Sequence, residues 1–338
     1  MKIGDTAERV HFEAKLEALQ AQIDWPRALV CTMEEPWSVF SSSVEVTPNQ
    51  IYHVADTSIE HLRSIPVPDG IRLVVAVGGG SPIDAAKYVG WSHDVPVIAV
   101  PTIASVDAMV TPAIAVRTRS IVKYVANCPP VDVFVVNSVI QKAPPRLNRA
   151  GLCDILSCHT ALFDWELAER REQDIRDKRV ASEASAVLND CITKLGDIRD
   201  VNALGIHALI DGFCTINDLT LHWGSARMEE GSEHFFAYAV EHFTQRHYVH
   251  GELVALGILL MSILQENDPQ RVRRILDDAD VRYHPSSLGI SDAELRLVLK
   301  SLKEFVRDNR LWFSVIDDRE IDEHGLVEQL YELIGRRN

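Results

Sequence analysis

Short apolar runs alternate with amphipathic stretches along the first half of the chain. Buried strands are predicted by the apolar runs at 28–33, 73–77, 96–102 and 131–136, and shorter strands at 44–46 and 50–54. Helices are predicted by the amphipathic segments 8–22, 58–64 and 82–91. Continuous apolar strands between helices are typical of a parallel sheet that is covered on both faces.

The pattern changes after Pro144 and Pro145, where strand-like runs give way to long helical periodicities. These periodicities predict helices at 149–170, 176–194, 201–226, 232–246, 250–266, 269–277, 292–308 and 322–335. We therefore expect an α/β N-terminal Rossmann-like domain at 1–147 and an all-α C-terminal helical domain at 148–338.

Three glycines, Gly78–Gly80, end the apolar run at 73–77. Ser81 is suited to cap the following helix, and Pro82 suits a first helical position. Unpaired glycine N–H groups at the start of a helix favour a phosphate, because the donors and the helix dipole point at it. The loop is neither GxGxxG nor GxxxxGK(S/T), so a nucleotide site and a simple tight turn both remain open.

A second polar segment follows the predicted strand at 96–102. Thr102, Ser105 and Asp107 are expected at the carboxyl edge of the sheet, where open α/β folds bind ligands. Two hydroxyls and a carboxylate on one loop suit a cofactor or a polyol. Helix capping by Ser105 or Asp107 is the more common use of such residues, so the segment alone does not decide between the two roles.

Asp154, His234 and His250 each lie at or near the start of a predicted helix. One carboxylate and two imidazoles suit Zn²⁺ or Fe²⁺, and three protein ligands leave a position open for a substrate oxygen. A chain of this length contains many such triples, so the residues alone favour ordinary core or surface positions.

The net charge of −15 restricts the possible partners. It argues against a nucleic-acid or anionic-membrane surface, which needs a basic patch. No apolar run approaches the ~20 residues of a membrane helix, and the N-terminus lacks the apolar core of a signal peptide. The six cysteines form no CxxC pair, which favours reduced, mostly buried thiols in a cytoplasmic protein.

Six segments, in order over roughly residues 70 to 260, resemble those of metal-dependent polyol dehydrogenases. The segments are GGGSPIDAAK, PTIASVDA, AGLCD (150–154), DWELA (164–168), SEHFF (232–236) and HGELVALG (250–257). The superfamily comprises iron-type alcohol dehydrogenase, glycerol dehydrogenase and dehydroquinate synthase, and the resemblance implies the dehydroquinate synthase-like fold. APPRLNRAGLCDILS, DWELA, SEHFF and HGE are most similar to the sn-glycerol-1-phosphate dehydrogenases, whereas PTIAS is closer to glycerol dehydrogenase.

The resemblance implies roles for individual residues. The residues matched to cofactor binding are Gly78, Gly79, Gly80 and Ser81 at the pyrophosphate, Asp84 on the helix that follows, and Thr102, Ser105 and Thr111 along the dinucleotide. Asp107 matches the carboxylate near the substrate hydroxyls. The residues matched to the three metal ligands are Asp154, His234 and His250.

Several positions depart from the family pattern. The iron-type branch carries a histidine one turn after the aspartate, where this chain has Cys158, so we expect Zn²⁺, with Fe²⁺ or Ni²⁺ as alternatives and Cys158 as a less favoured ligand. Cys153 replaces a usual glycine, Asn137 a common aspartate, and Arg117 the tyrosine that glycerol dehydrogenases place beside the cofactor. These departures put the substrate in question more than the chemistry.

The resemblance implies NAD- or NADP-dependent, metal-assisted, reversible oxidation of a polyol or polyol phosphate to a ketone, of the glycerol-1-phosphate/dihydroxyacetone phosphate type. Lys123 is a candidate for a substrate phosphate, although a surface lysine is the more common case, and Glu34 or Glu35 suits a ribose 2′-hydroxyl and favours NAD. The alternatives are a sugar-phosphate cyclase like dehydroquinate synthase, a dehydrogenase for another polyol or sugar-like ketone, and a nucleotide-binding regulator. The family implies a small-molecule partner and a homo-oligomer.

Overall fold

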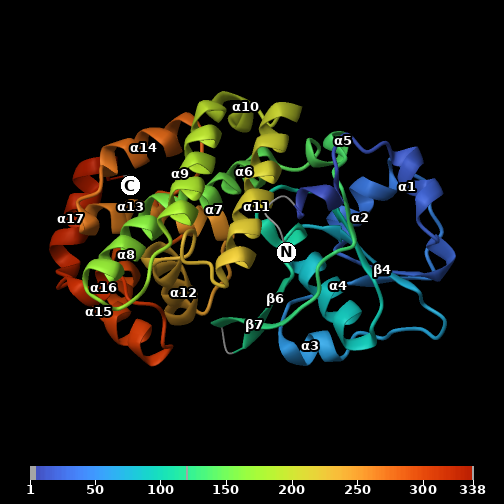
Figure 1. Cartoon of the computed structure of the whole chain (residues 1–338), viewed down its shortest axis with the longest axis horizontal. Coiled ribbons are helices and arrows are strands. Elements are labelled where there is room, and N and C mark those ends of the chain that lie inside the picture. Colours follow the sequence, from blue (N-terminus) through green and yellow to red (C-terminus); the bar gives the residue numbers. More distant parts are fainter. Residues whose placement is uncertain (1–4, 119–120, 337–338) are drawn as a thin grey trace.

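A six-stranded parallel sheet forms the centre of the N-terminal half in the computed structural model, which describes residues 5–118 and 121–336 (Figure 1). In spatial order its strands are β1 (Val10–His11), β8 (Asp132–Phe134), β5 (Val97–Pro101), β4 (Leu73–Gly78), β2 (Ala28–Thr32) and β3 (Gln50–His53). Every pair in it is parallel, which confirms the predicted sheet. The expected strands at 28–33, 50–54, 73–77, 96–102 and 131–136 all form in part or in full.

The central strands are apolar throughout because both of their faces are covered. Along β4, Val74 and Ala76 belong to one hydrophobic cluster, while Val75 and Val77 belong to another on the opposite face. Helices α1 (Leu16–Gln22) and α2 (Glu34–Ser41) contribute Leu19 and Phe40 to the second cluster, and α4 (Gly80–His93) contributes Ile83 to the first; α3 (Ile59–Arg63) follows β3.

The start of the predicted helix at 82–91 was placed too late. Helix α4 begins at Gly80, and its N-cap is Gly79, so Ser81 and Pro82 already lie inside the first turn. Glycine is tolerated at an N-cap almost as well as serine, because it leaves the backbone amides free to find another partner. This cap makes no side-chain hydrogen bond to the helix.

Two predictions in the first 50 residues were wrong. The segment 8–22 is α-helical only from Leu16, after a short 3-10 turn at Ala7–Arg9, because Val10 is buried and pairs with Val133 as part of a strand. Val44–Val46 forms no strand; Val44 is buried in the apolar cluster instead, so its hydrophobicity reflects packing of a loop.

An antiparallel hairpin, β6 (Ala113–Thr118) and β7 (Ile121–Asn127), stands apart from the main sheet and was not predicted. Lys123, the candidate for a substrate phosphate, lies inside β7. The pattern is hard to recognise because the bulky Ile114 and Val116, buried on one face of β6, alternate with the small apolar Ala113 and Ala115 on the other face rather than with polar residues.

The second half is helical, as predicted (Figure 1). Its helices are α5 (Asn137–Ile140), α6 (Pro145–Ala150), α7 (Leu152–Leu156), α8 (Cys158–Arg170), α9 (Lys178–Thr193), α10 (Leu195–Arg199), α11 (Ala203–Trp223), α12 (Ser232–Thr244), α13 (His250–Gln265), α14 (Pro269–Asp278), α15 (Asp292–Asp308), α16 (Val315–Asp318) and α17 (Glu323–Ile334). The helix expected at 149–170 is divided among α6, α7 and α8, because the chain turns at Gly151 and Ser157. The domain boundary between residues 147 and 148 stays a prediction.

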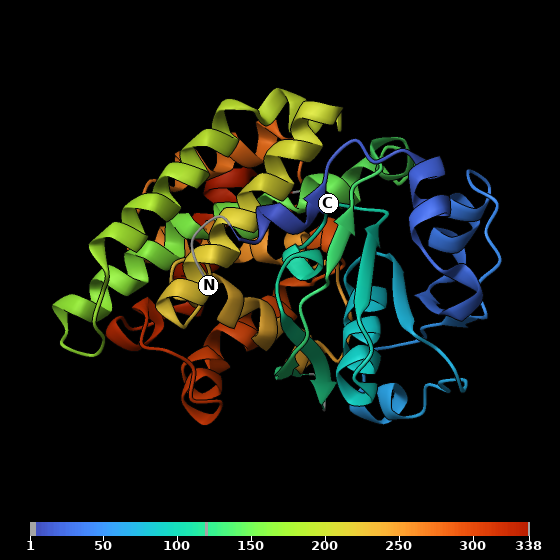
Figure 2. The ribbon, with the colours of Figure 1, turned by 45° about the vertical axis from the view of Figure 1, so that its right-hand side comes forward.

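The N-terminal residues connect the two halves (Figure 2). Asn217 Nδ2 on α11 donates to Thr6 Oγ1 at 2.9 Å, and a few residues later the chain enters the sheet as β1. This strap fixes the carboxyl edge of the sheet relative to the helices, which is where the cavity described below lies. No helix in the described part of the chain is long and apolar enough to cross a membrane.

Candidate functional site

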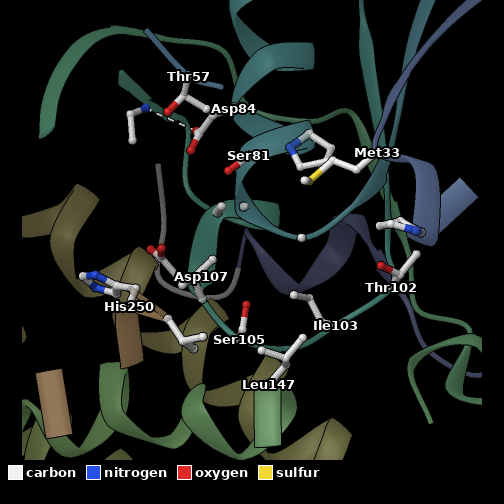
Figure 3. Close-up of a pocket in the computed structure, with 18 of the residues that line it drawn as sticks. Met33, Thr57, Ser81, Asp84, Thr102, Ile103, Ser105, Asp107, Leu147 and His250 are labelled. Carbon is white, nitrogen blue, oxygen red and sulfur yellow. Dashed lines mark hydrogen bonds between the residues drawn. The ribbon is translucent and has the colours of Figure 1, made fainter. Parts of the chain in front are cut away.

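A cavity of about 630 Å³ lies between the carboxyl edge of the sheet and the helical half. The predicted site residues that line it are Gly79, Gly80, Ser81, Asp84, Thr102, Ser105, Asp107, Thr111, Asp154 and His250. Figure 3 shows Asp107 and His250 on one side of this space, Met33 and Thr102 on the other, and Ser81 between them. Its size and position are those of a small-molecule site at a sheet edge.

The glycine loop brings unpaired backbone donors to the cavity. Gly78 has φ of 154° and its absent Cβ would lie 2.6 Å from Pro82 Cγ, so only glycine fits there, although Gly78 itself does not line the cavity. Gly79, Gly80 and Ser81 do line it, at the start of a 14-residue helix without a side-chain cap. Such a helix start suits an anionic group, because its N–H groups lack partners.

The end of β2 lies at the same cavity. Met33, Glu34 and Glu35 follow this strand and line the space, so both glutamates considered for a ribose hydroxyl are within the cavity wall. Their position next to the glycine loop agrees with the order of strands, since β2 and β4 are neighbours. That Glu34 or Glu35 contacts a ribose hydroxyl stays a prediction.

Asp84 makes structural contacts with Lys87 and Ala115 at the wall of the cavity. Its Oδ1 lies 2.9 Å from Lys87 Nζ and accepts from Ala115 N at 3.2 Å. Lys87 is fully buried and donates to Ala113 O at 2.5 Å and Thr111 O at 3.4 Å. Burial raises the pKa of Asp84 despite the nearby ammonium. Together the pair anchors β6 and the Thr111 backbone beneath the cavity.

Asp154, His234 and His250 meet in space although they come from three helices. One ligand atom from each lies within 4.8 Å of the others, as metal coordination requires. His250 Nε2 is 3.6 Å from Asp154 Oδ1, and the two imidazole centroids are 5.3 Å apart. His234, on α12, belongs to this group of three residues although it is not among the residues that line the cavity.

A buried glutamate orients His234. Glu233 Oε1 accepts from His234 Nδ1 at 2.9 Å and from Gly231 N at 2.7 Å, and Oε2 accepts from Thr160 Oγ1 at 2.7 Å. A carboxylate only accepts, so Nδ1 carries a proton and Nε2 is the ring nitrogen left to bind a cation once it loses its own proton. The sequence analysis gave Glu233 no role, and its place in SEHFF directly before the expected ligand His234 was the available signal.

Gly251 brings α13 into contact with the segment that carries Asp154. A Cβ on Gly251 would lie 2.0 Å from Ala150 O, so any side chain would push α13 away. His250, the first residue of α13, therefore comes within reach of Asp154 on α7. Close packing against Ala150 therefore explains why the HGE segment has glycine at position 251.

The protonation states of the cluster depend strongly on burial. Burial raises the pKa of Asp154 to about 8, with the Asp107 charge acting in the same direction, and lowers the pKa of His250 to about 3. For His234, burial is opposed by the hydrogen bond and charge of Glu233, and the pKa is raised to about 9. Asp154 Oδ1 is buried without a hydrogen-bond partner. A divalent cation would compensate both the orphaned oxygen and the crowded acidic groups.

Asp107 lies beside this cluster and lines the same cavity. Burial raises its pKa to about 6, and the Lys87 charge opposes that rise. Its carboxyl is therefore placed to hold a ligand hydroxyl near the cluster. Thr102 and Ser105, earlier on the same loop, are buried at the cavity wall.

The structure does not bring Lys123 to the cavity. Val122 and Tyr124 of β7 line the space, whereas Lys123 is exposed between them, because successive strand residues point to opposite faces. Arg117 on β6 lines the cavity instead, and its Nη1 donates to Glu241 Oε2 at 2.7 Å. In the sequence Arg117 stands out only as a departure, and its alternation with the buried Ile114 and Val116 places it on the opposite face of β6 without showing that this face lines a cavity.

The remaining departures lie outside the cluster. Cys158 is buried and is not part of the metal-ligand group found among the described residues. Burial raises its pKa well above the ordinary thiol value, which disfavours the thiolate that a metal needs. Asn137 Nδ2 lies 3.1 Å from His207 Nε2, and Cys153 is a buried free thiol, as all six cysteines are free and only Cys128 is partly exposed.

Comparison with known proteins agrees with the architecture. The family model of iron-containing alcohol dehydrogenase matches residues 27–144. The folds of solved structures are similar over nearly the whole chain. A probable glycerol dehydrogenase from Sinorhizobium meliloti has a TM-score of 0.73 at 18% identity, covering 96% of this chain and 95% of its own. A maleylacetate reductase from Agrobacterium tumefaciens has a TM-score of 0.68 at 16% identity, covering 98% and 97%.

Curated relatives are similar in sequence over most of their length. The glycerol-1-phosphate dehydrogenase (NAD(P)+) of Methanosphaerula palustris is 30% identical over 266 residues, 78% of this chain and 73% of that protein. The protein of the same description from Hyperthermus butylicus is 31% identical over 264 residues, with the same two coverages of 78% and 73%. By this likeness over most of both chains, the chain belongs to the family of the glycerol-1-phosphate dehydrogenases.

Proposed function

We propose that this protein catalyses the NAD(P)-dependent, metal-assisted interconversion of a polyol phosphate and its ketone, of the glycerol-1-phosphate/dihydroxyacetone phosphate type. The observation that carries the proposal is one cavity with two kinds of wall. Unpaired glycine-loop amides lie on one side and the Asp154–His234–His250 cluster contributes to the other. The relatives described as glycerol-1-phosphate dehydrogenases support the substrate class.

The dinucleotide is assigned to the sheet edge. Gly79, Gly80 and Ser81 are the proposed rest for its pyrophosphate, and Glu34 or Glu35 would accept from the ribose hydroxyls. Thr102, Ser105 and Thr111 offer hydroxyls along the path towards Asp107. The bound nicotinamide supplies a hydride acceptor or donor.

The residues of the cluster fit a divalent cation. Two imidazoles and a carboxylate are suitable donors for Zn²⁺, and the orphaned buried Oδ1 of Asp154 is the contact that a cation would satisfy. We propose Zn²⁺ ahead of Fe²⁺ or Ni²⁺, because Cys158 stands apart and no fourth histidine joins the three residues in the described chain. When bound, such a cation supplies a Lewis acid that lowers the pKa of the substrate hydroxyl.

The chain's own residues orient the substrate. Asp107, whose pKa is raised to about 6, is largely ionised at neutral pH and accepts from a substrate hydroxyl next to the reacting carbon. Glu233 holds His234 in the tautomer that keeps Nε2 free. Val122 and Val249 add apolar surface to the wall of the same cavity.

The test is a substrate screen followed at 340 nm, with and without phosphate on the substrate. Dihydroxyacetone phosphate, dihydroxyacetone and simple ketones are offered to the zinc-loaded protein with NADH or NADPH. The proposal predicts reduction of dihydroxyacetone phosphate at the highest kcat/KM. Consumption of a sugar phosphate without net change in NADH would instead favour the cyclase.

We also expect a homo-oligomer, as the family implies. Sedimentation equilibrium of the purified protein measures its mass directly. A monomer at micromolar concentration would contradict that expectation without touching the proposed chemistry.

A further inference from the structure

Arg117 is a charged cavity residue to which the proposed function gives no task. It follows Ala113 and Ala115 on the cavity-facing side of β6. The two small side chains leave open space before it, and 27% of the Arg117 side chain remains exposed. The guanidinium is therefore the charged group that β6 presents to the cavity.

Glu241 holds this guanidinium by one edge. Arg117 Nη1 donates to Glu241 Oε2 at 2.7 Å and Nη2 donates to Oε1 at 3.3 Å. The same Oε1 accepts from Tyr248 N at 3.4 Å, two residues before His250. A guanidinium has five N–H donors, so a two-point contact with one carboxylate leaves donors for a second anion.

The pair lies on the same face of α12 as the metal cluster. Glu241 follows His234 by seven residues, which is about 10 Å along a helix and nearly two full turns. Tyr238 stands between them, with its ring centroid 6.2 Å from that of His234, and also lines the cavity. Arg117 is thus held at the cavity wall by Glu241, which lies about two helical turns along α12 from His234.

Positive charge is scarce around this cavity. Among the described lining residues the other cation is Lys142, whose Nζ donates to Ser43 Oγ at 2.7 Å, beyond the end of α2. Helix α13 starts at His250 without a side-chain cap, so its N–H groups add positive potential at the same end as Arg117. An anion near the cluster therefore has one side chain to pair with.

We propose that Arg117 binds the phosphomonoester of the substrate, with Glu241 keeping the guanidinium in place. This inference rests on the proposed function and names the group that selects its substrate. A phosphomonoester carries about −1.5 to −2 charges at pH 7 and matches the planar fork of arginine. Lys123, on the opposite face of β7, plays no part in this contact.

The kinetic test compares glycerol 1-phosphate with glycerol in the zinc-loaded protein. Arg117→Met is expected to raise KM for glycerol 1-phosphate about tenfold or more, the size of one lost charge-assisted contact, with kcat changed far less. The kcat/KM for glycerol is expected to stay within about twofold, a negligible energy difference. Arg117→Lys should restore part of the KM, and Arg63→Met, an exposed arginine on α3, serves as the matched control.

Three results would overturn the proposal. An equal loss with both substrates would make the Arg117–Glu241 pair a purely structural clamp. A larger KM increase in Lys123→Met than in Arg117→Met would move the phosphate to β7. A change in the preference between NADP and NAD in Arg117→Met would assign the guanidinium to the cofactor phosphate.

A binding measurement separates this inference from the proposed reaction. Inorganic phosphate is titrated into wild type, Arg117→Lys and Arg117→Met while the thermal midpoint is recorded. Wild type should gain stability with millimolar phosphate. Arg117→Met should lose the part of this gain that Arg117 contributes, while phosphate at the Gly79–Ser81 amides keeps the rest, and it should keep a wild-type circular dichroism spectrum. Arg117→Lys carries the comparison if the methionine variant does not fold. An identical phosphate response in all three overturns the inference. A wild type that binds phosphate through Arg117 but reduces no ketone refutes the proposed function alone.

Discussion

Neutralising Glu233 tests how the proposed metal ligand His234 is held in position. Glu233 is fully buried and accepts from Gly231 N, His234 Nδ1 and Thr160 Oγ1. In Glu233→Gln the amide oxygen keeps the first two contacts. The new N–H faces Thr160, whose hydroxyl is free to accept because it also donates to Ser157 O at 3.1 Å. The substitution therefore removes a negative charge and almost no hydrogen bonds.

The expected loss of zinc affinity follows from the hydrogen bond between the Glu233 carboxylate and the proposed ligand His234. Removing such a partner of a ligand histidine costs ten- to hundredfold in metal affinity, about 1.4–2.7 kcal/mol. We expect the full loss at pH 9 and a smaller one at pH 7. The reason is that the Glu233 charge, which contributes to raising the pKa of His234 to about 9, also favours the competing proton. Glu233→Ala should in addition destabilise folding by about 1–3 kcal/mol, because Gly231 N loses its partner.

The assay is competition for Zn²⁺ between metal-free protein and a chromophoric chelator at pH 7 and pH 9. Glu320→Gln, a change at a nearly fully exposed glutamate, controls for the general effect of one lost charge. Equal affinities for wild type and Glu233→Gln at both pH values would refute the reasoning. A loss that is larger at pH 7 than at pH 9 would refute the proposed competition between Zn²⁺ and the His234 proton.

Three further predictions concern the same region. Zn²⁺ affinity of wild type should rise about tenfold or more per pH unit from pH 6 to 8, because Asp154, with its pKa raised to about 8, must lose a proton to bind; a flat profile by chelator competition contradicts this. Asp154→Asn should abolish stoichiometric zinc in elemental analysis yet leave the thermal midpoint of the metal-free protein at pH 7 unchanged, since the native carboxyl is mostly neutral there; a midpoint lower by many degrees speaks against the shifted pKa. Gly251→Ala should destabilise the fold by about 1–3 kcal/mol, because its Cβ meets Ala150 O at 2.0 Å; an unchanged urea midpoint would show that α13 has room to move.

Much of the framework was predictable from hydrophobic pattern. Strands β2, β4 and β5 are buried on both faces, so their sequences are apolar without interruption and stand out from the amphipathic helices. Helices such as α9 and α15 were predicted nearly to their ends, because one apolar face repeats over several turns.

Elements whose burial depends on distant partners were missed. β1 is two residues long and exists because Val10 pairs with Val133, a partner more than 120 residues away. In β6 the buried Ile114 and Val116 alternate with two alanines and an arginine that line the cavity, so the contrast between apolar and polar positions that marks a strand is weak.

The candidate site shows the same division. The glycine loop was visible from the strand–glycine–helix order alone, whereas Asp154, His234 and His250 were joined by family resemblance and no local pattern links them. Glu241 meets Arg117 from 124 residues away, so only the fold shows why Arg117 rather than Lys123 faces the cavity.

The return of activity as zinc is added to metal-free protein tests the proposed zinc site most directly. Reduction of dihydroxyacetone phosphate is followed at 340 nm in wild type and in His250→Ala, one of the three proposed ligands. We predict that the wild-type rate rises from near zero and levels off at one zinc per chain, and that the variant stays inactive. Full activity of the metal-free protein, or of His250→Ala, would contradict the proposed site.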